Sequence, residues 1–146
     1  MKRYQLSIAT LIYAKGTLAF NCDVKNIQGR YAMTLTGTGI TQSPPSIIPF
    51  IGPVAGIGVA SLNEDASLEL IEHLNGAGQI FENIKLKGKF SIEKNCTGNA
   101  IAINTFNNKE HKYKFVVANG GKKLFLMMTY PTSPILNAEL TKIDSK

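Results

Sequence analysis

The amino-acid sequence predicts an all-β protein, a single antiparallel β-barrel of about eight strands. From Gly29 onward, short stretches of alternating apolar and polar residues recur, and clusters of Gly, Asn or Pro interrupt them; residues 85–93 and 111–117 are the clearest examples. Side chains alternate across a strand with a period of two, so each stretch buries one face and exposes the other. No long helical pattern separates the stretches, which favours one antiparallel barrel or sandwich.

The first expected strand covers residues 29–38 and carries Tyr31, Met33 and Leu35 on one face. The Asn119-Gly120-Gly121 sequence is a tight hairpin signal between two later strands. The other expected strands are residues 54–62, 67–74, 79–92 (as one strand or two), 99–106, 111–118, 122–130 and 135–143. About eight strands are the usual number for a small closed barrel, with an interior that is filled or sized for one ligand.

The long connection over residues 39–53 contains four prolines, which exclude a central strand. Around its prolines it also contains large apolar residues that need a buried environment: Ile47, Ile48, Phe50 and Ile51. A connection of this length inside a compact domain is typical of a functional loop or of a lid over an opening.

The chain has 146 residues, enough for one domain, and a net charge of +6. Residues 85–123 hold nine lysines and two glutamates. Lysines at the outward positions of alternating strands keep a sheet soluble and discourage edge pairing. Because no arginine and few aromatic residues are interleaved with these lysines, we expect no nucleic-acid partner. We also expect no contact with a membrane. A protein partner is an alternative use of this basic face.

The N-terminus predicts export to the periplasm or the exterior. Lys2 and Arg3 precede an apolar run over residues 6–13, which is the order found in signal peptides, and the run is too short to span a membrane. We therefore divide the chain into a signal peptide (1–16), an N-terminal segment (17–28) and a barrel domain (29–146). The alternative is that residues 1–16 form a first strand or helix of the domain.

Two cysteines, Cys22 and Cys96, suggest one disulfide in an exported chain. The bridge would tie the N-terminal segment to a turn in the middle of the fold, and it would stabilise the fold by a few kcal/mol. No C-x-x-C spacing indicates a redox or metal role for these residues.

Gly29-Arg30-Tyr31 resembles the opening of a lipocalin-like (calycin) barrel, in which a Gly-x-Trp packs across the barrel floor; Tyr31 stands where that family has Trp. The segments 49–63 and 88–98 are similar to small secreted bacterial proteins of uncharacterised function, thought to form barrels like those of lipocalins or allene oxide cyclases. The resemblance covers about residues 27–143 and implies a barrel fold and export.

No catalytic motif, metal-binding motif or cofactor motif is present, so we expect no catalytic residues, no metal and no cofactor. His111 shares a strand face with Tyr113 and Phe115, which predicts a partly buried, hydrogen-bonded histidine rather than a catalytic base. His73 lies close to Glu69 and Glu72 in the sequence, and we interpret these three residues as a solvated acidic strand rather than a metal cluster.

The first functional hypothesis is a binding protein that holds a small apolar or amphipathic ligand in the barrel, beneath the proline-rich loop. The second is an interaction or structural module with a filled barrel and a basic outer face. The third is a cyclase- or isomerase-like enzyme with an apolar cavity. The candidate interior and rim residues for a ligand are Tyr31, Met33, Leu35, Ile48, Phe50, Phe90, Ile103, Tyr113, Phe115, Phe125 and Met127.

Overall fold

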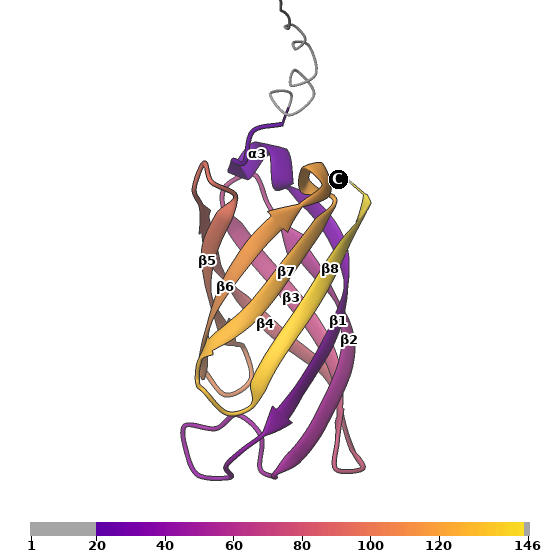
Figure 1. Cartoon of the computed structure of the whole chain (residues 1–146). Coiled ribbons are helices and arrows are strands. Elements are labelled where there is room, and N and C mark those ends of the chain that lie inside the picture. Colours follow the sequence, from indigo (N-terminus) through magenta and orange to yellow (C-terminus); the bar gives the residue numbers. More distant parts are fainter. Residues whose placement is uncertain (1–19, 145–146) are drawn as a thin grey trace, which may run out of the picture.

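The computed structural model describes residues 20–144 and contains a closed barrel of eight antiparallel strands (Figure 1). Each strand pairs with its neighbours in the sequence, and β1 also pairs with β8, which closes the sheet. The strands are β1 (Gly29–Gly39), β2 (Gly52–Leu62), β3 (Ser67–Gly76), β4 (Gln79–Ile92), β5 (Thr97–Asn104), β6 (Glu110–Ala118), β7 (Lys123–Tyr130) and β8 (Ile135–Asp144).

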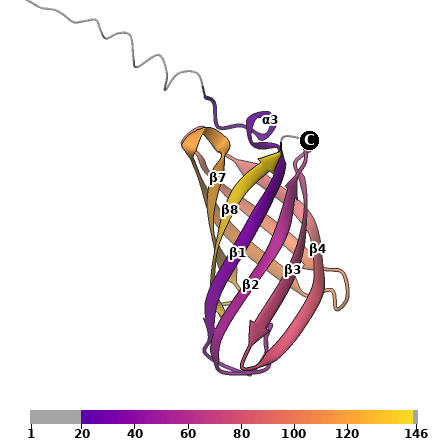
Figure 2. The same cartoon turned by 90° about the vertical axis from the view of Figure 1, so that its right-hand side faces the viewer.

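The predicted fold class and strand number are confirmed. Residues 79–92 form one long strand, which settles the alternative that the sequence left open. Figures 1 and 2 show an elongated barrel with different ends. We call the end next to the N-terminal segment the helix end, and the end that carries the connections 40–51, 77–78, 105–109 and 131–134 the loop end.

The helix end is covered by the short helix α3 (Val24–Ile27) and the 3-10 turn η2 (Asn119–Gly121). The Asp23 side chain caps α3 by accepting a hydrogen bond from the Asn26 backbone N–H. The fully buried Tyr31 donates its hydroxyl to the Ile27 carbonyl at 2.6 Å, and the same oxygen lies 3.0 Å from the Gly121 carbonyl. Tyr31, which belongs to β1, therefore joins the barrel wall to the helix α3 and to the 3-10 turn η2.

The predicted disulfide between Cys22 and Cys96 is present, with 5.1 Å between the two Cα atoms. It attaches the segment before α3 to the β4–β5 turn, so the cover of the helix end is held covalently as well as by Tyr31. Disulfides of this kind are typical of proteins that fold in an oxidising, non-cytoplasmic compartment.

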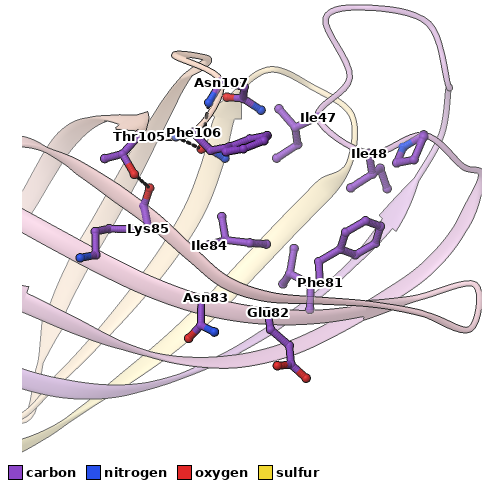
Figure 3. A pocket seen from close by; sticks show the side chains of 13 residues that line it. Ile47, Ile48, Phe81, Glu82, Asn83, Ile84, Lys85, Thr105, Phe106 and Asn107 are labelled. Atoms are coloured by element: carbon purple, nitrogen blue, oxygen red, sulfur yellow. Dashed lines mark hydrogen bonds between the residues drawn. The ribbon is translucent and has the colours of Figure 1, made fainter.

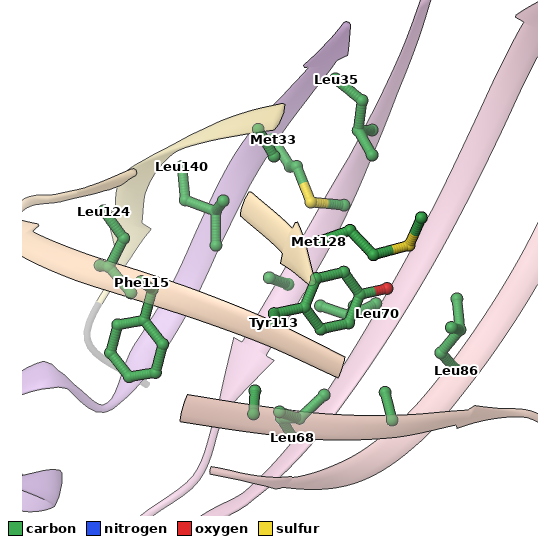
Figure 4. Close-up of a cluster of buried hydrophobic side chains, with 14 of the residues drawn as sticks. Met33, Leu35, Leu68, Leu70, Leu86, Tyr113, Phe115, Leu124, Met128 and Leu140 are labelled. Carbon is green, nitrogen blue, oxygen red and sulfur yellow. The ribbon is translucent and has the colours of Figure 1, made fainter. Parts of the chain in front are cut away.

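Apolar side chains fill the barrel from the helix end to its middle (Figure 4). Large residues from opposite strands meet there, and Phe90 and Phe115 make an edge-to-face contact with ring centres 6.4 Å apart. The space left between them is a cavity of about 20 Å³, enough for at most a water molecule. This half of the barrel is a packed core.

The proline-rich connection 40–51 folds over the loop end. Ile48 and Phe50 are buried, and the Phe50 ring occupies the place that a Cβ at Gly76 would take. Ser133, in the β7–β8 connection, holds the start of the connection 40–51, because its Oγ accepts hydrogen bonds from the N–H groups of Ile40 and Thr41. The connection is therefore an ordered cover.

The expected signal peptide, residues 1–16, lies outside the described residues. Among residues 20–144, no helix has the length and apolar composition needed to cross a bilayer.

Removing the disulfide should strongly destabilise the barrel. The bridge joins positions 74 residues apart, and loop-closure entropy predicts a loss of about 4 kcal/mol in the free energy of unfolding for Cys22→Ala/Cys96→Ala. Urea unfolding of the variant and of the oxidised wild type measures the difference. Reduced wild type is the control and should match the variant; a loss below about 1 kcal/mol would contradict the expectation.

Candidate functional site

The barrel wall is incomplete beside the first half of β4. Pairing between β4 and β5 begins at Leu86 and Asn104, so the first seven residues of β4 have no partner on β5. The pairing ends one residue further on, at Thr105, whose N–H donates to the Lys85 carbonyl at 2.9 Å and whose hydroxyl donates to the same oxygen. An opening therefore lies between β4 and the β5–β6 connection.

A bulge in β4 shapes this opening. Between Glu72 and Leu74 on β3, the register with β4 shifts by one residue, and Asn83 adopts a positive φ of 58°. The Asn83 N–H donates to His73 Nδ1 at 3.2 Å. Because the bulge changes the alternation, Phe81 before it and Ile84 after it both lie on the inner side of the strand.

A cavity of about 480 Å³ occupies the opening (Figure 3). Apolar side chains from the loop-end cover, from β3, from β4 and from the β5–β6 connection converge on it, while the Glu82 carboxylate points away from them. We call this cavity the mouth pocket. Its lining residues are Ile47, Ile48, Pro49, Leu74, Phe81, Glu82, Asn83, Ile84, Lys85, Asn104, Thr105, Phe106 and Asn107.

The β5–β6 side of the pocket is held by its own side chains. Asn104 Oδ1 accepts hydrogen bonds from the N–H groups of Phe106 and Asn107, and Asn107 Oδ1 accepts one from the Lys109 N–H. These bonds form the turn without using the Phe106 ring, which is 95% exposed. The ring is therefore an apolar wall that the fold does not require.

A buried polar cluster lies inside the barrel: Glu72 on β3, whose neighbours Leu74 and Ile84 line the mouth pocket, with His111 and Tyr113 on β6. Each side chain is at most 4% exposed. His111 Nδ1 lies 3.1 Å from the Tyr113 hydroxyl. Within residues 20–144, no hydrogen-bond donor is in contact with the Glu72 carboxyl, although such a buried group normally has one.

The surroundings change the ionisation of all three groups. Burial raises the pKa of Glu72 to about 7. Burial, assisted by the charge of Lys109, lowers the pKa of His111 to about 4. Burial and the charge of Glu72 raise the pKa of Tyr113 well above its usual range. The cluster therefore contains a neutral histidine, a neutral phenol and a carboxyl that titrates near neutral pH.

Most of the candidate ligand residues lie inside the barrel, at different depths. Tyr31, Phe90 and Phe115 belong to the packed helix-end half, Met33, Leu35 and Tyr113 lie nearer the middle, and Ile48 and Phe50 belong to the loop-end cover. Of these, Ile48 lines the mouth pocket.

Three of the candidates, Ile103, Phe125 and Met127, face outward instead of inward, with exposed fractions of 43, 47 and 49%. The inward residues of β5 are small because aromatic rings already fill the space. A Cβ at Gly98, for example, would lie 2.2 Å from Phe115 Cζ. On β7 the inward positions belong to Leu124 and Met128.

The interpretation of Glu72 as a solvated residue is wrong. It shares the inner face of β3 with Leu68, Leu70 and Leu74, and the alternation of these residues was the signal that places it inside. His73 caps the β4 bulge. The predicted hydrogen-bonding contact of His111 is present, with Tyr113, and the side chain is fully rather than partly buried.

The lysines of β4 and β6 lie on the outer surface, as the alternation predicts. The strand register places Lys89, Ile101 and Lys112 in one row across three strands. Lys114 pairs with Met127 in the next row. The basic face therefore alternates with exposed apolar side chains.

Comparison with protein-family models, with curated proteins and with solved structures finds no match for this chain. Within the described part of the chain, no three His, Cys, Asp or Glu side chains gather in a way that could hold a metal ion. The assignment of function therefore depends on the mouth pocket and on the polar cluster beside it.

The cluster predicts opposite pH effects for two of its members. The pKa of Glu72 is higher in the folded than in the unfolded protein, so its stabilising contribution is present below about pH 4.5 and is lost as the pH rises through about 7. The pKa of His111 is lower when folded, so its contribution is present above about pH 6.5 and is lost as the pH falls through about 4. Each shift corresponds to about 3 kcal/mol.

The two effects nearly cancel in the wild type, and single variants should separate them. Urea unfolding between about pH 7.5 and 4.5 should show that Glu72→Gln loses stability on acidification more steeply than the wild type. His111→Phe should instead gain stability over the same range. Parallel pH profiles for the wild type and both variants would contradict the assigned shifts.

Proposed function

We propose that this protein is an exported β-barrel that binds a small apolar or amphipathic molecule in the mouth pocket. The observation that carries the proposal is the cavity of about 480 Å³ at the opening between β4 and the β5–β6 connection. Ligand pockets of about 300–1,000 Å³ with mainly apolar walls and a few polar groups are typical of small-molecule sites.

The lining matches an amphipathic ligand. Ile48, Ile84 and Phe81 provide an apolar floor, and the Lys85 ammonium and the Glu82 carboxylate stand at the margin. The closed meander of eight strands is compatible with a lipocalin-like barrel, an architecture that often holds one small ligand. That compatibility supports the binding class and leaves the ligand to be identified.

Export to the periplasm or the exterior is part of the proposal. The Cys22–Cys96 disulfide supports it, because such bridges persist in oxidising compartments. The charged start and the apolar run in residues 1–16 support it from the sequence.

The pocket is tested with two exposed phenylalanines. Phe106→Ser removes an apolar wall of the mouth pocket, and Phe125→Ser makes the same change on the outer surface of β7. Binding of the neutral dye N-phenyl-1-naphthylamine, followed by fluorescence, should weaken about tenfold in the first variant, since burying part of a phenyl ring contributes about 1.4 kcal/mol. The second variant should bind like the wild type.

The reverse order of the two affinities would move the binding site to the outer groove between β6, β7 and β8, which Phe125 and Met127 line. Absence of dye binding by the wild type would reject the proposed function. Native mass spectrometry of protein from an exporting host should show the natural ligand as extra mass that is lost on denaturation.

A second candidate function is protein interaction through the basic outer face. The row of Lys89, Ile101 and Lys112 favours it, because exposed apolar residues between lysines suit an acidic, partly apolar partner surface. A Lys87/Lys89/Lys112→Ser variant should lose such a partner in a binding assay. If the variant retains every protein partner of the wild type, this candidate is excluded.

A further inference from the structure

Glu72 has an unusual position for a carboxyl group. Its Cα pairs with that of Ile84, a residue that lines the mouth pocket, and Leu74, the next inward residue of the same strand, lines it too. Residues paired across antiparallel strands have Cβ atoms about 5 Å apart, and inward neighbours along a strand are about 7 Å apart. Glu72 is thus the inward neighbour of two residues, Leu74 and Ile84, that line the pocket.

The groups packed around Glu72 provide no cation. Its register partners are Gly58 on β2 and Ile84 on β4, and the Met33 side chain from β1 reaches Gly58. From across the barrel, β6 contributes Tyr113, whose pKa is raised by burial and also by the charge of Glu72. Burial is the single cause that raises the pKa of Glu72 itself, so no positive charge of the described residues compensates for it.

The hydrogen-bond donors and acceptors around Glu72 indicate which kind of ligand group would pair with its carboxyl. Glu72 has two free acceptor oxygens, and the Tyr113 oxygen and the imidazole of His111 complete a polar cluster that carries no positive charge. A buried carboxylate without a partner destabilises the folded protein, and a bound cation that donates hydrogen bonds reduces this penalty. An anionic group would be repelled, and a neutral hydroxyl would supply one donor and no charge.

We propose that the Glu72–Tyr113–His111 cluster is an internal subsite for the protonated amine of a ligand whose apolar part occupies the mouth pocket. The inference rests on the proposed function and specifies its ligand class as a small amphipathic amine. A primary ammonium has three donors and one charge, which matches the carboxyl and the phenol oxygen. Leu74 and Ile84, the side chains between pocket and carboxyl, would move aside on binding.

The test uses three eight-carbon probes of equal chain length: n-octylammonium, n-octanol and n-octanoate. Each displaces N-phenyl-1-naphthylamine from the wild type and from three variants, Glu72→Gln, Glu82→Gln and Glu69→Gln. We expect the wild type to bind octylammonium at least about tenfold more tightly than octanol, and octanoate most weakly. Glu72→Gln should bring octylammonium to within about twofold of octanol while leaving the octanol affinity unchanged.

Glu69→Gln is the matched control, because Glu69 belongs to the same strand as Glu72 but lies on its outer face, 3.9 Å from Lys87 Nζ. This variant should keep the preference for the amine. Glu82→Gln tests the alternative position of the cation, because Glu82 lines the same pocket with its carboxylate directed away from the apolar lining side chains. If Glu82→Gln abolishes the preference and Glu72→Gln does not, the cation is held at the margin of the pocket and the proposal is overturned.

The remaining outcomes separate this inference from the proposed function. If the wild type binds the dye and octanol but does not prefer octylammonium, the subsite is rejected and the mouth pocket stands. If neither the dye nor any probe binds, both are rejected.

A second measurement does not depend on a variant that folds. Carbon-13 NMR of the Glu72 carboxyl in the wild type should show a lower pKa with octylammonium bound than without it, because a nearby cation favours the ionised form. An unchanged Glu72 pKa at saturation with octylammonium would overturn the proposal.

Discussion

The pairing of β1 with β8 is the constraint on which the rest of the structure depends. It joins the first strand to the last, so that every strand is paired on both sides over at least part of its length. In a closed sheet, a slip of one residue would exchange the inner and outer faces of a strand, so closure fixes the side on which every residue lies. The packed helix end follows from this: apolar inward residues fill it, and Tyr31, whose hydroxyl is a polar group there, bonds to the Ile27 carbonyl.

The loop end departs from this regular arrangement at one strand. The bulge at Asn83 changes the alternation of β4, and the residues before Leu86 lose their partner on β5. The main-chain groups at the bulge still find partners, because His73 accepts from the Asn83 N–H and Thr105 donates to the Lys85 carbonyl. The sheet is therefore interrupted here while these main-chain groups keep their hydrogen-bond partners. The mouth pocket is a consequence of backbone geometry as much as of side chains.

The sequence predicts the elements that carry a local signal. Alternation and turn residues locate the strands within a few residues, and the two cysteines give the disulfide. The prediction from sequence fails where both faces of a strand are apolar. In β7, Phe125 and Met127 alternate with Leu126 and Met128, and hydrophobicity does not decide which pair points inward. The mouth pocket is beyond local reasoning, because it depends on a bulge whose residue Asn83 also fits an ordinary exposed strand position.

The prediction that Glu72 is solvated fails for a different reason, because alternation alone indicates an inward position for this residue. Its identity as a charged residue outweighed its position between Leu70 and Leu74. A fourth leucine at this position would fit the pattern and would need no partner, whereas the carboxyl lowers the stability of the folded protein at neutral pH through its raised pKa. Local features that cost stability concentrate at sites that bind or react. The neighbours of Glu72, Leu74 and Ile84, line the mouth pocket, so a ligand in the pocket would reach the carboxyl by displacing these two side chains.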